Sequence, residues 1–509
     1  MSKQNILRSA AGLTLSGIIA KTIDFLFRAY YSTLLGSEGM GLFSLVFSFH
    51  GLILTFATAG LGVAVSKTVS LYFATKNNNC IKKTMKIALL WVVAMSLGVI
   101  LTVCIFSKNI AESFLKEPRI RLSIIFLSPS ILFMSISYCI KGYFYAARKS
   151  LIPASSEFLE QAVKIISITL LLNIWRPLGI QHGCEAVFLG ITIGEFSSCF
   201  FLSLFFAKDY IMLKGGTPKE KIVPSLIKIA LPSMTSSLSG SFLRMQEDVL
   251  IMSGLRESGL SQATALSQYG MLKGMVMPLI IFPLTLLSSC LTLLVPEISR
   301  ASEMKSTLSL KSLISRIYRF TAFGGFMVCT LFVAFSKELS QWVYSAPQIA
   351  PWVTIIALLS PIMFIDSVSC GILGGMGKQS ALLVFSLCDS GLRICLIWLL
   401  LPKFGMNALL FIIIVSNLFT AYNTFSTAIR SAKMSYKLSR CLICQLFVTA
   451  SSLITFHSLT VFFDYGKSYF TTLFLMGFTI FTYTLFSSCL YKALRKDISW
   501  LFGRMFLNN

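Results

Sequence analysis

The stretch "GIIAKTIDFLFRAYYSTLLG", residues 17–36, is an apolar run that nevertheless carries three charged side chains, Lys21, Asp24 and Arg28. Similar apolar runs recur along the chain, each near the ~20 residues that an α-helix needs to cross a bilayer. Of the 509 residues, 55% are hydrophobic and only 13% are charged, whereas a soluble chain carries roughly 25% charged residues. The sequence therefore predicts an all-α polytopic membrane protein with about fourteen transmembrane helices.

The net charge of +24 would indicate a nucleic-acid partner in a soluble protein. Here, most Lys and Arg residues outside the predicted helices fall on the side of the membrane that carries the N-terminus. This asymmetry is the positive-inside rule, so we expect both termini in the cytoplasm. The basic loops then lie near anionic lipid headgroups, and we expect membrane lipids but no nucleic acid as partners.

The sequence predicts an internal duplication. "LSPSILFMSISYCIKGYFYAARKS" (127–150) resembles "LSPIMFIDSVSCGILGGMGKQS" (359–380), although any two apolar helices share some likeness. Six spans return the chain to the same side, so the two halves would be parallel and related by a pseudo-two-fold axis along the membrane normal. We predict an N-lobe at 1–222 with spans one to six, a C-lobe at 223–433 with spans seven to twelve, and two further spans with a basic tail at 434–509.

Charged residues inside the predicted spans mark candidate sites, because a charge at mid-bilayer costs roughly 2.5–3.5 kcal/mol on insertion scales. Lys21, Asp24 and Arg28 are spaced i, i+3 and i+7, which places them on one face of a helix. A cationic stripe of this kind suits an anionic substrate, since Arg offers a planar fork of donors for phosphate oxygens and Lys a point charge. The residues predicted to bind substrate in a cavity are Lys21, Asp24, Arg28, Arg244 and Lys273.

A second group of intramembrane charges has two interpretations. The carboxylates could bind Na⁺ or carry a proton that drives transport, or the charges could form ion pairs that hold the helices together, as the i, i+4 spacings allow. This group comprises Glu157, Glu160, Lys164, Glu247, Asp248, Asp389 and Arg393. No resident cofactor and no metal site is predicted, because the only Cys-x-x-Cys motif lacks the second pair that a zinc site needs.

The sequence argues against an enzyme. Its three histidines, His50, His182 and His457, are not part of a His-Glu-x-x-His motif, and no Gly-rich phosphate loop follows a strand. The loops are also too short to fold as a catalytic domain. A purely structural role is a further alternative, but it would leave the intramembrane charges without a use.

Several stretches resemble a known family: "RAYYSTLLGSEGMGLFSL" (28–45), "AGLGVAVSKTVS" (59–70), "IKGYFYAARKSLIPASSEFLEQAVKI" (140–165) and "YGMLKGMVMPLIIFPLTLLSSCLTLLVPEISRA" (269–301). They are similar to the stage V sporulation protein B and polysaccharide-biosynthesis flippases, members of the multidrug/oligosaccharidyl-lipid/polysaccharide exporter superfamily. The resemblance extends over nearly the whole chain.

The resemblance implies two six-helix lobes in a V shape, two additional C-terminal helices, and alternating access in a bacterial cell membrane. It also implies transport of an anionic polyprenyl-pyrophosphate-linked saccharide from the inner to the outer leaflet. Lipid-linked peptidoglycan precursor is the favoured substrate, and sporulation is a candidate context. Among lipid II flippases, span one supplies basic residues to the cavity; Arg28 stands in a comparable place and Lys21 one residue out of step. A basic residue at the start of their span two has no counterpart in "GLFSLVFSFHG".

Two other functions stay open. The chain could be a cation-coupled multidrug exporter of the same superfamily, although such a protein would favour an acidic, aromatic-lined cavity. It could also carry another lipid-linked oligosaccharide, of the exopolysaccharide or teichoic type. We expect the protein to act as a monomer.

Overall fold

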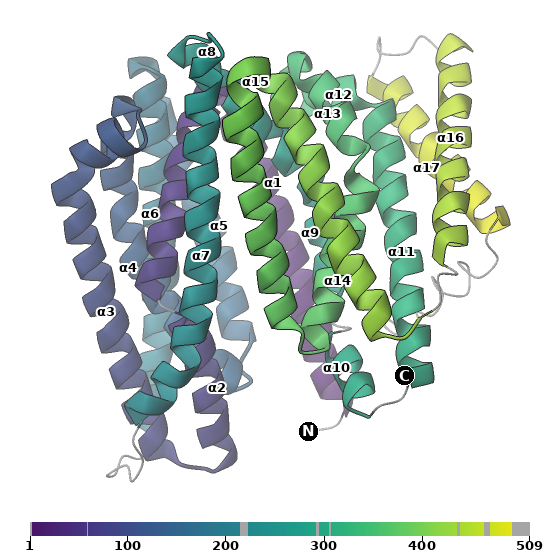
Figure 1. The fold of residues 1–509 in the computed structure, drawn as a ribbon. Coiled ribbons are helices and arrows are strands. Elements are labelled where there is room, and N and C mark those ends of the chain that lie inside the picture. The colour runs from purple at the N-terminus through teal and green to yellow at the C-terminus, as the bar shows by residue number, and fades with distance from the viewer. Residues whose placement is uncertain are drawn as a thin grey trace. The chain divides into compact units, whose positions relative to one another are not determined.

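The computed structural model describes residues 3–58, 60–213, 222–291, 295–304, 307–434, 438–462 and 469–490. Over these ranges all regular structure is helical, and they contain no strand. Within these described ranges, ten helices are long and apolar enough to cross a membrane, or up to eleven if a bent pair, Pro347–Ala357 with Ser360–Gly375, counts as one span. The prediction of an all-α, multi-pass membrane protein is confirmed (Figure 1).

The chain divides into two compact units, Met1–Gly274 (unit 1) and Met275–Asn509 (unit 2). The elements that begin in unit 1 are α1 (Lys3–Thr58), α2 (Leu61–Ala74), α3 (Asn78–Asn109), η1 (Ile110–Phe114), η2 (Pro118–Ile120), α4 (Arg121–Ala146), α5 (Leu151–Trp175), η3 (Arg176–Leu178), α6 (Ile180–Met212), α7 (Ile222–Glu257), α8 (Gln262–Tyr269) and η4 (Gly270–Val276). This division follows packing, whereas the predicted lobes follow the internal duplication, so the lobe boundary near residue 222 stays a prediction.

The element α1 reverses direction at Gly36, which has φ 71° and ψ −177°. In a straight helix the rings of Tyr31 and Phe43 would be separated by about 18 Å along the axis, yet their centroids lie 5.6 Å apart. A positive φ of this kind favours glycine, since it has no Cβ to clash with the backbone. The first half of α1, with the charged stripe, therefore packs against its own second half.

The element α15 in unit 2 reverses in the same way at Gly405, where φ is 54°. The side chain of Ser416 donates to Asp389 at 2.6 Å, although the two residues are 27 positions apart. A continuous helix would separate them by about 40 Å. Because two of the continuous helical segments each double back, counting segments does not count membrane crossings, and the number of fourteen spans stays a prediction.

The core of unit 1 joins α2, α3 and α4 with parts of α6 and α7. Its largest fully buried members include Leu61, Ile81, Met85 and Phe144. Lipid tails are as apolar as these side chains, so close packing rather than water exclusion must hold the helices together. The result is a scaffold that fixes the charged side chains of α1, α5 and α7.

Unit 2 contains α9 (Met277–Leu291), α10 (Val295–Glu303), α11 (Thr307–Ala334), α12 (Ser336–Tyr344), η5 (Pro347–Ile349), α13 (Ala350–Ala357), α14 (Ser360–Gly375), α15 (Gln379–Ser431), α16 (Leu438–Phe462) and α17 (Tyr469–Leu490). The last two helices are attached by polar contacts. The Tyr483 hydroxyl donates to Gln445 Oε1 at 2.7 Å and lies 3.1 Å from the Phe323 carbonyl oxygen. One buried tyrosine therefore links α17, α16 and α11.

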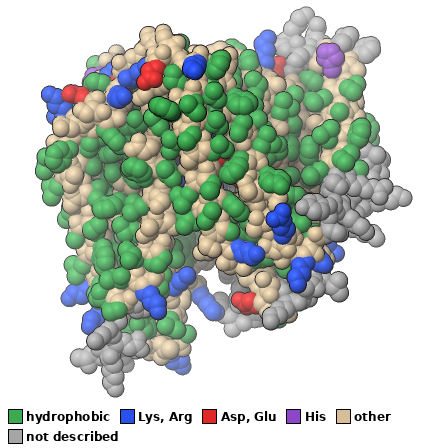
Figure 2. Space-filling view, in the orientation of Figure 1, with side chains coloured by type: hydrophobic (Ala, Val, Ile, Leu, Met, Phe, Trp, Pro, Cys, Tyr) green, Lys and Arg blue, Asp and Glu red, His purple; other side chains and the backbone are tan. Residues whose placement is uncertain are grey.

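The outer surface of unit 1 has the pattern of a membrane protein. Large apolar side chains of α3 are exposed, among them Leu90, Leu101 and Ile105. Figure 2 shows hydrophobic side chains over the middle of this face, with Lys and Arg gathered toward its ends. An apolar band of this extent would not be stable in water, so it is the surface that contacts lipid.

Candidate functional site

Arg28 lies where the first half of α1 packs on the second. Its guanidinium carbon Cζ is 5.3 Å from the centroid of the Phe43 ring, and that ring stacks on Phe188 with centroids 5.2 Å apart. The side chain is half-buried, and its Nε atom is buried without a hydrogen-bond partner. Within the described residues Arg28 has no carboxylate partner, so an aromatic face provides the stabilisation that a cation–π contact can give.

Asp24 shares the helical face of Arg28 but is held from another helix. Lys164 Nζ on α5 lies 2.6 Å from Asp24 Oδ1, and Gln161 Nε2 is 3.5 Å from the same oxygen. The i, i+4 spacing suggested Glu160 as the partner of Lys164, whereas the ion pair in the structure is made to Asp24. Both Lys21 and Asp24 are exposed. The tertiary structure thus turns the anion of the stripe toward Lys164 of α5.

A neighbouring group of charges joins α4, α5 and α6. Lys141 Nζ lies 3.1 Å from Glu157 Oε1, Glu160 is half-buried, and Glu195 is buried. Sequence analysis did not single out Lys141, although its position inside a predicted span was a usable signal. The group therefore contains an ion pair together with two further carboxyl groups.

A third group surrounds Lys273, which lies in the π-helical segment η4. Its Nζ atom is 3.1 Å from Asp248 Oδ1 and 3.5 Å from Glu247 Oε1 on α7. Ser48 on α1 donates to Asp248 Oδ2 at 2.5 Å. Both carboxylates are buried, so Lys273 is held by two anions. We call Ser48, Glu247, Asp248 and Lys273 the Lys273 cluster; π-helical turns are frequent at functional sites.

The remaining predicted residues are separate from these groups. Arg244 on α7 is exposed, and its Nη2 atom donates to Ser241 Oγ at 3.1 Å. In unit 2, Arg393 Nε lies 3.2 Å from Asp389 Oδ2, four residues earlier on α15. Asp389 also accepts from Ser416. Asp389 therefore contacts both an arginine and a serine side chain of α15.

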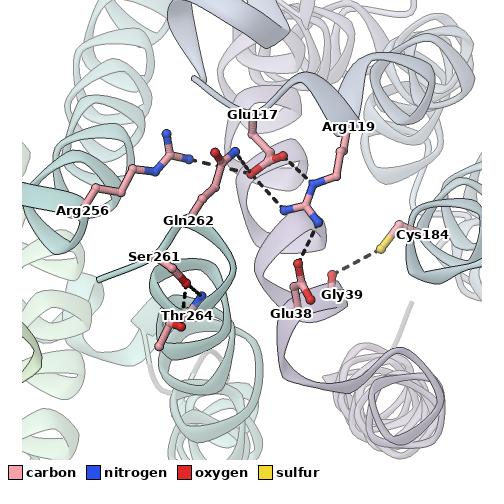
Figure 3. Close-up of polar contacts among 9 residues, drawn as sticks. All are labelled: Glu38, Gly39, Glu117, Arg119, Cys184, Arg256, Ser261, Gln262 and Thr264. Atoms are coloured by element: carbon pink, nitrogen blue, oxygen red, sulfur yellow. Dashed lines mark hydrogen bonds and ion pairs between the residues drawn. The ribbon is translucent and has the colours of Figure 1, made fainter. Parts of the chain in front are cut away.

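A group that sequence analysis missed lies at one end of unit 1 (Figure 3). Glu117, between η1 and η2, has a fully buried side chain. Arg119 Nε donates to Glu117 Oε1 at 2.7 Å, and Gln262 Nε2 donates to Glu117 Oε2 at 2.8 Å. Arg256 Nη2 is 3.7 Å from Glu117 Oε2, and Arg119 Nη1 reaches Glu38 at 2.7 Å. We call these five residues the Glu117 cluster. The signal in the sequence was the glutamate flanked by two basic residues in "KEPR", residues 116–119.

The pKa of Glu117 reflects this environment. Burial alone raises the pKa of the carboxyl group, because it penalises the charged form. The hydrogen bonds from Arg119 and Gln262 and the charges of Arg119 and Arg256 act in the opposite direction and outweigh it, so the pKa lies below its ordinary value of 4.5. Glu117 is therefore an anion at neutral pH, held by hydrogen-bond donors from η2 and α8 and by the charge of Arg256 on α7.

The described residues contain no group of three or more His, Cys, Asp or Glu side chains placed to hold a metal ion. His50 is buried and bonds Ser130 at 2.9 Å, and His182 Nδ1 lies 2.8 Å from Glu185 Oε2. The chemistry that the charged groups offer is therefore the binding of anions by arginine and of cations or protons by carboxylates.

Comparison with solved structures identifies the fold. The lipid II flippase MurJ in an inward closed conformation aligns with a TM-score of 0.72 at 14% identity, over 95% of this chain and 99% of that chain. An inward-facing multidrug resistance transporter of the MATE family, MOP superfamily, aligns with a TM-score of 0.67 at 14% identity, over 83% of this chain and 98% of that chain. The fold is therefore that of the MOP superfamily, as the sequence resemblance implied.

Comparison with curated proteins points to the same group. The stage V sporulation protein B of Bacillus subtilis (strain 168) is 25% identical over 413 residues, 79% of each chain. The sporulation protein YkvU of the same organism is 20% identical over 350 residues, 66% of this chain and 75% of that one. Two of the solved proteins that share this fold are named as a flippase and a multidrug resistance transporter.

A family model described as "Polysaccharide biosynthesis protein" matches residues 6–302, more than half of the chain. The matched region contains all of the charged groups of unit 1 and the stretches on which the resemblance was based. The chain is a member of the polysaccharide biosynthesis protein family.

Proposed function

We propose that this protein is a flippase that moves an anionic polyprenyl-pyrophosphate-linked saccharide from the inner to the outer leaflet by alternating access. Lipid-linked peptidoglycan precursor is the first candidate substrate. The family, the relation to a stage V sporulation protein, and a fold shared with a lipid II flippase support the proposal. The main structural support is the environment of the Arg28 guanidinium group.

Arg28 differs from the other intramembrane cations whose ion pairs are known. Lys141, Lys164 and Lys273 each lie within 3.5 Å of a carboxylate oxygen, whereas Arg28 contacts an aromatic ring and keeps a buried Nε without an acceptor. A buried unsatisfied donor costs about 1–3 kcal/mol. A phosphate oxygen would satisfy that donor and accept from the guanidinium fork at the same time. Arg28 is therefore suited to receive an anion from outside the chain.

The chemistry of the substrate explains why a protein is needed. Moving a pyrophosphate and its sugars through hydrocarbon strips polar groups of water without replacement, which is prohibitively costly. A cationic pathway through the protein substitutes for that water while the polyprenyl tail stays in lipid. The charged groups described above suit such a pathway, since they lie on α1, α4, α5, α6, α7 and η4, while α3 presents exposed apolar side chains.

The membrane potential and ion coupling are two sources of energy for transport. A potential that is negative inside favours outward movement of an anionic headgroup, because it moves toward the positive side, by roughly 2.3 kcal/mol per charge per 100 mV. Return of the emptied cationic site toward the inner side is favoured by the same potential. Coupling to Na⁺ or H⁺ through Glu157, Glu160, Glu247, Asp248 or Asp389 is a further part of the proposal. Both termini are placed in the cytoplasm, and the working unit is a monomer.

Reconstitution into liposomes tests the proposal. Purified protein is given lipid-linked peptidoglycan precursor, a teichoic-type lipid-linked saccharide or an uncharged polyprenol glycoside, and headgroup accessibility on the far side is measured over time. We expect flipping of at least one pyrophosphate-linked saccharide and none of the uncharged lipid. The Arg28→Ala variant should lose flipping, while Arg176→Ala, which removes an exposed arginine of η3, should keep it. Equal flipping by Arg28→Ala and wild type would refute the role of Arg28.

A second candidate, a cation-coupled multidrug exporter, is favoured by the fold shared with a multidrug resistance transporter and by the buried acidic pair Glu247 and Asp248. Depletion of the protein in its host separates the two. An exporter would leave the cells more sensitive to cationic drugs, whereas a flippase would cause lipid-linked precursor to accumulate.

A further inference from the structure

We propose that the Glu117 cluster is a latch that holds α7 and α8 against α1 and the η1–η2 segment, and that its release opens this end of unit 1. Alternating access gives the latch a reason to open, so the inference rests on the proposed function in that respect. The experiments below detect the opening without a substrate, so the two can fail separately.

The cluster connects segments that are distant in the sequence. Glu117 receives Gln262 from α8 and Arg256 from α7, while Arg119 holds both Glu117 and Glu38 of α1. Figure 3 shows Arg256 and Gln262 approaching Glu117 from one side and Arg119 from the other. Lys116 adds a further link, since its Nζ donates to Ser253 Oγ on α7 at 3.3 Å. Moving α7 and α8 away would break all of these contacts except those that Arg119 makes.

The energetics of the cluster suit a contact that opens and closes. Desolvation offsets much of the attraction in a buried ion pair, so its net stabilisation is small even though removing one partner is costly. Arg256 keeps Nε and Nη2 buried without hydrogen-bond acceptors, which costs about 1–3 kcal/mol per group. Water that enters on opening would satisfy these donors and both charges. The closed arrangement is therefore not deeply favoured over an open, hydrated one.

The backbone of α1 is in close contact with the backbones of α8 and η4 beside the charged residues. A Cβ atom on Gly270 would lie 2.0 Å from the Ser37 carbonyl oxygen, and one on Gly41 would lie 2.3 Å from the Leu266 carbonyl oxygen. The hydroxyls of Ser37 and Ser267 are 2.6 Å apart. The side chain of Leu266 also packs on Gly41, so this contact depends on glycine at positions 41 and 270. The polar cluster adds the attraction of charged groups to it.

Both sides of the latch adjoin a π-helical segment. The segment η1 (Ile110–Phe114) ends three residues before Glu117, and η4 (Gly270–Val276) follows α8 directly. A π-helical turn marks a place where the helical hydrogen-bond register is irregular and where functional movement often occurs. Each segment can therefore absorb a displacement near the latch without unfolding the long helix next to it.

Hydrogen–deuterium exchange of the purified protein tests the latch. Glu117→Gln removes the central anion, and Gln262→Ala removes only the contact from α8. The matched control is Glu112→Gln, because Glu112 is an exposed glutamate of η1 outside the cluster. We expect amide exchange to rise about tenfold or more in segments 110–121 and 257–270, which reports a local opening, with less change in Gln262→Ala and none in the control.

Two outcomes would overturn the inference. Unchanged exchange in both Glu117→Gln and Gln262→Ala would mean that the cluster does not hold these segments. Faster exchange throughout unit 1 in both variants would mean that the cluster stabilises the whole fold rather than one joint.

A reversible cross-link provides an independent test that does not weaken the fold. Ser37→Cys and Ser267→Cys are introduced together, with Cys184, which lies against Gly39, changed to Ser. A disulfide should form, since the two hydroxyl oxygens are in contact. In the oxidised protein we expect exchange at 110–121 and 257–270 to slow severalfold and any flipping to stop, with both restored by reductant. Flipping at the wild-type rate with the cross-link intact would show that this end need not open.

Discussion

Arg28 and Lys273 are both cations within the helices of unit 1, and they have opposite surroundings. Lys273 lies within 3.5 Å of two buried carboxylates, whereas Arg28 lies over Phe43 with a buried Nε that has no acceptor. The charge of Lys273 is compensated by carboxylates of the protein itself, whereas the Arg28 guanidinium can still donate to a ligand. The same residue class, found by the same argument from sequence, can therefore serve cohesion in one place and recognition in another.

The contrast between Arg28 and Lys273 is tested most directly by removing each cation in turn. Arg28→Ala should reduce flipping by roughly a hundredfold, because losing a charge-assisted contact to phosphate is worth about 3 kcal/mol. Protein abundance should stay near that of wild type, since no internal carboxylate loses its partner. Flipping in liposomes and membrane content by immunoblotting measure the two effects; a loss of abundance that matches the loss of flipping would contradict the assignment.

Lys273→Ala should mainly lower the stability and abundance of the protein, in contrast to Arg28→Ala. It leaves the buried carboxylates Glu247 and Asp248 without their cation, at a cost of about 3–5 kcal/mol in stability. We expect a lower melting temperature in detergent and reduced abundance. The variant Lys273→Met combined with Glu247→Gln and Asp248→Asn should recover much of the stability, because it removes all three charges together. Failure of this neutralised variant to recover would show that Lys273 has a role beyond balancing the acids.

Arg28→Lys sharpens the assignment of Arg28. Lysine keeps the charge but not the planar fork of donors, so a site that receives a pyrophosphate should retain binding and lose about tenfold in flipping. A variant as active as wild type would indicate that charge alone is needed at this position. Side-by-side flipping rates of Arg28→Lys and Arg28→Ala provide the measurement.

The Glu117 cluster predicts a pH dependence. The folded pKa of Glu117 lies below its ordinary value of 4.5, so its contribution is fully present above about pH 4.5 and is lost as the pH falls through the folded pKa. The charged groups around it are Arg119, Arg256 and Glu38, and Gln262 adds a neutral donor. Amide protection at 257–270, corrected for the intrinsic pH dependence of exchange, should fall on acidification below pH 4.5 in wild type, and this loss should be absent in Glu117→Gln.

Asp24→Asn should have the smallest effect. The ion pair between Asp24 and Lys164 has an aspartate side chain that is 52% exposed, and pairs of this kind contribute at most about 1 kcal/mol in water. We expect a melting temperature within a few degrees of wild type and a change in flipping of only a few fold. A loss as large as that of Arg28→Ala would place Asp24 in the substrate-binding machinery itself.

The repetition of apolar runs was enough to predict a helical, multi-pass membrane protein, and the family followed from local motifs. Helical spacing also placed Lys21, Asp24 and Arg28 on one face. The spacing could not identify the partner of Asp24, because Lys164 reaches it from α5, 140 positions away in the chain. Nor could it find Lys141 with Glu157, whose contact depends on how α4 packs against α5.

The sequence by itself determined which segments are helical, that they lie in a membrane, and which side chains would be costly there. Those properties depend on composition and on spacing within one helix. Only the tertiary structure decided that Lys273 lies between two carboxylates, that Arg28 lies over an aromatic ring, and that Glu117 is surrounded by polar groups from η2, α7 and α8. The reason is physical: the energy of a buried charge depends on the groups within a few ångströms, and packing brings those groups from distant segments.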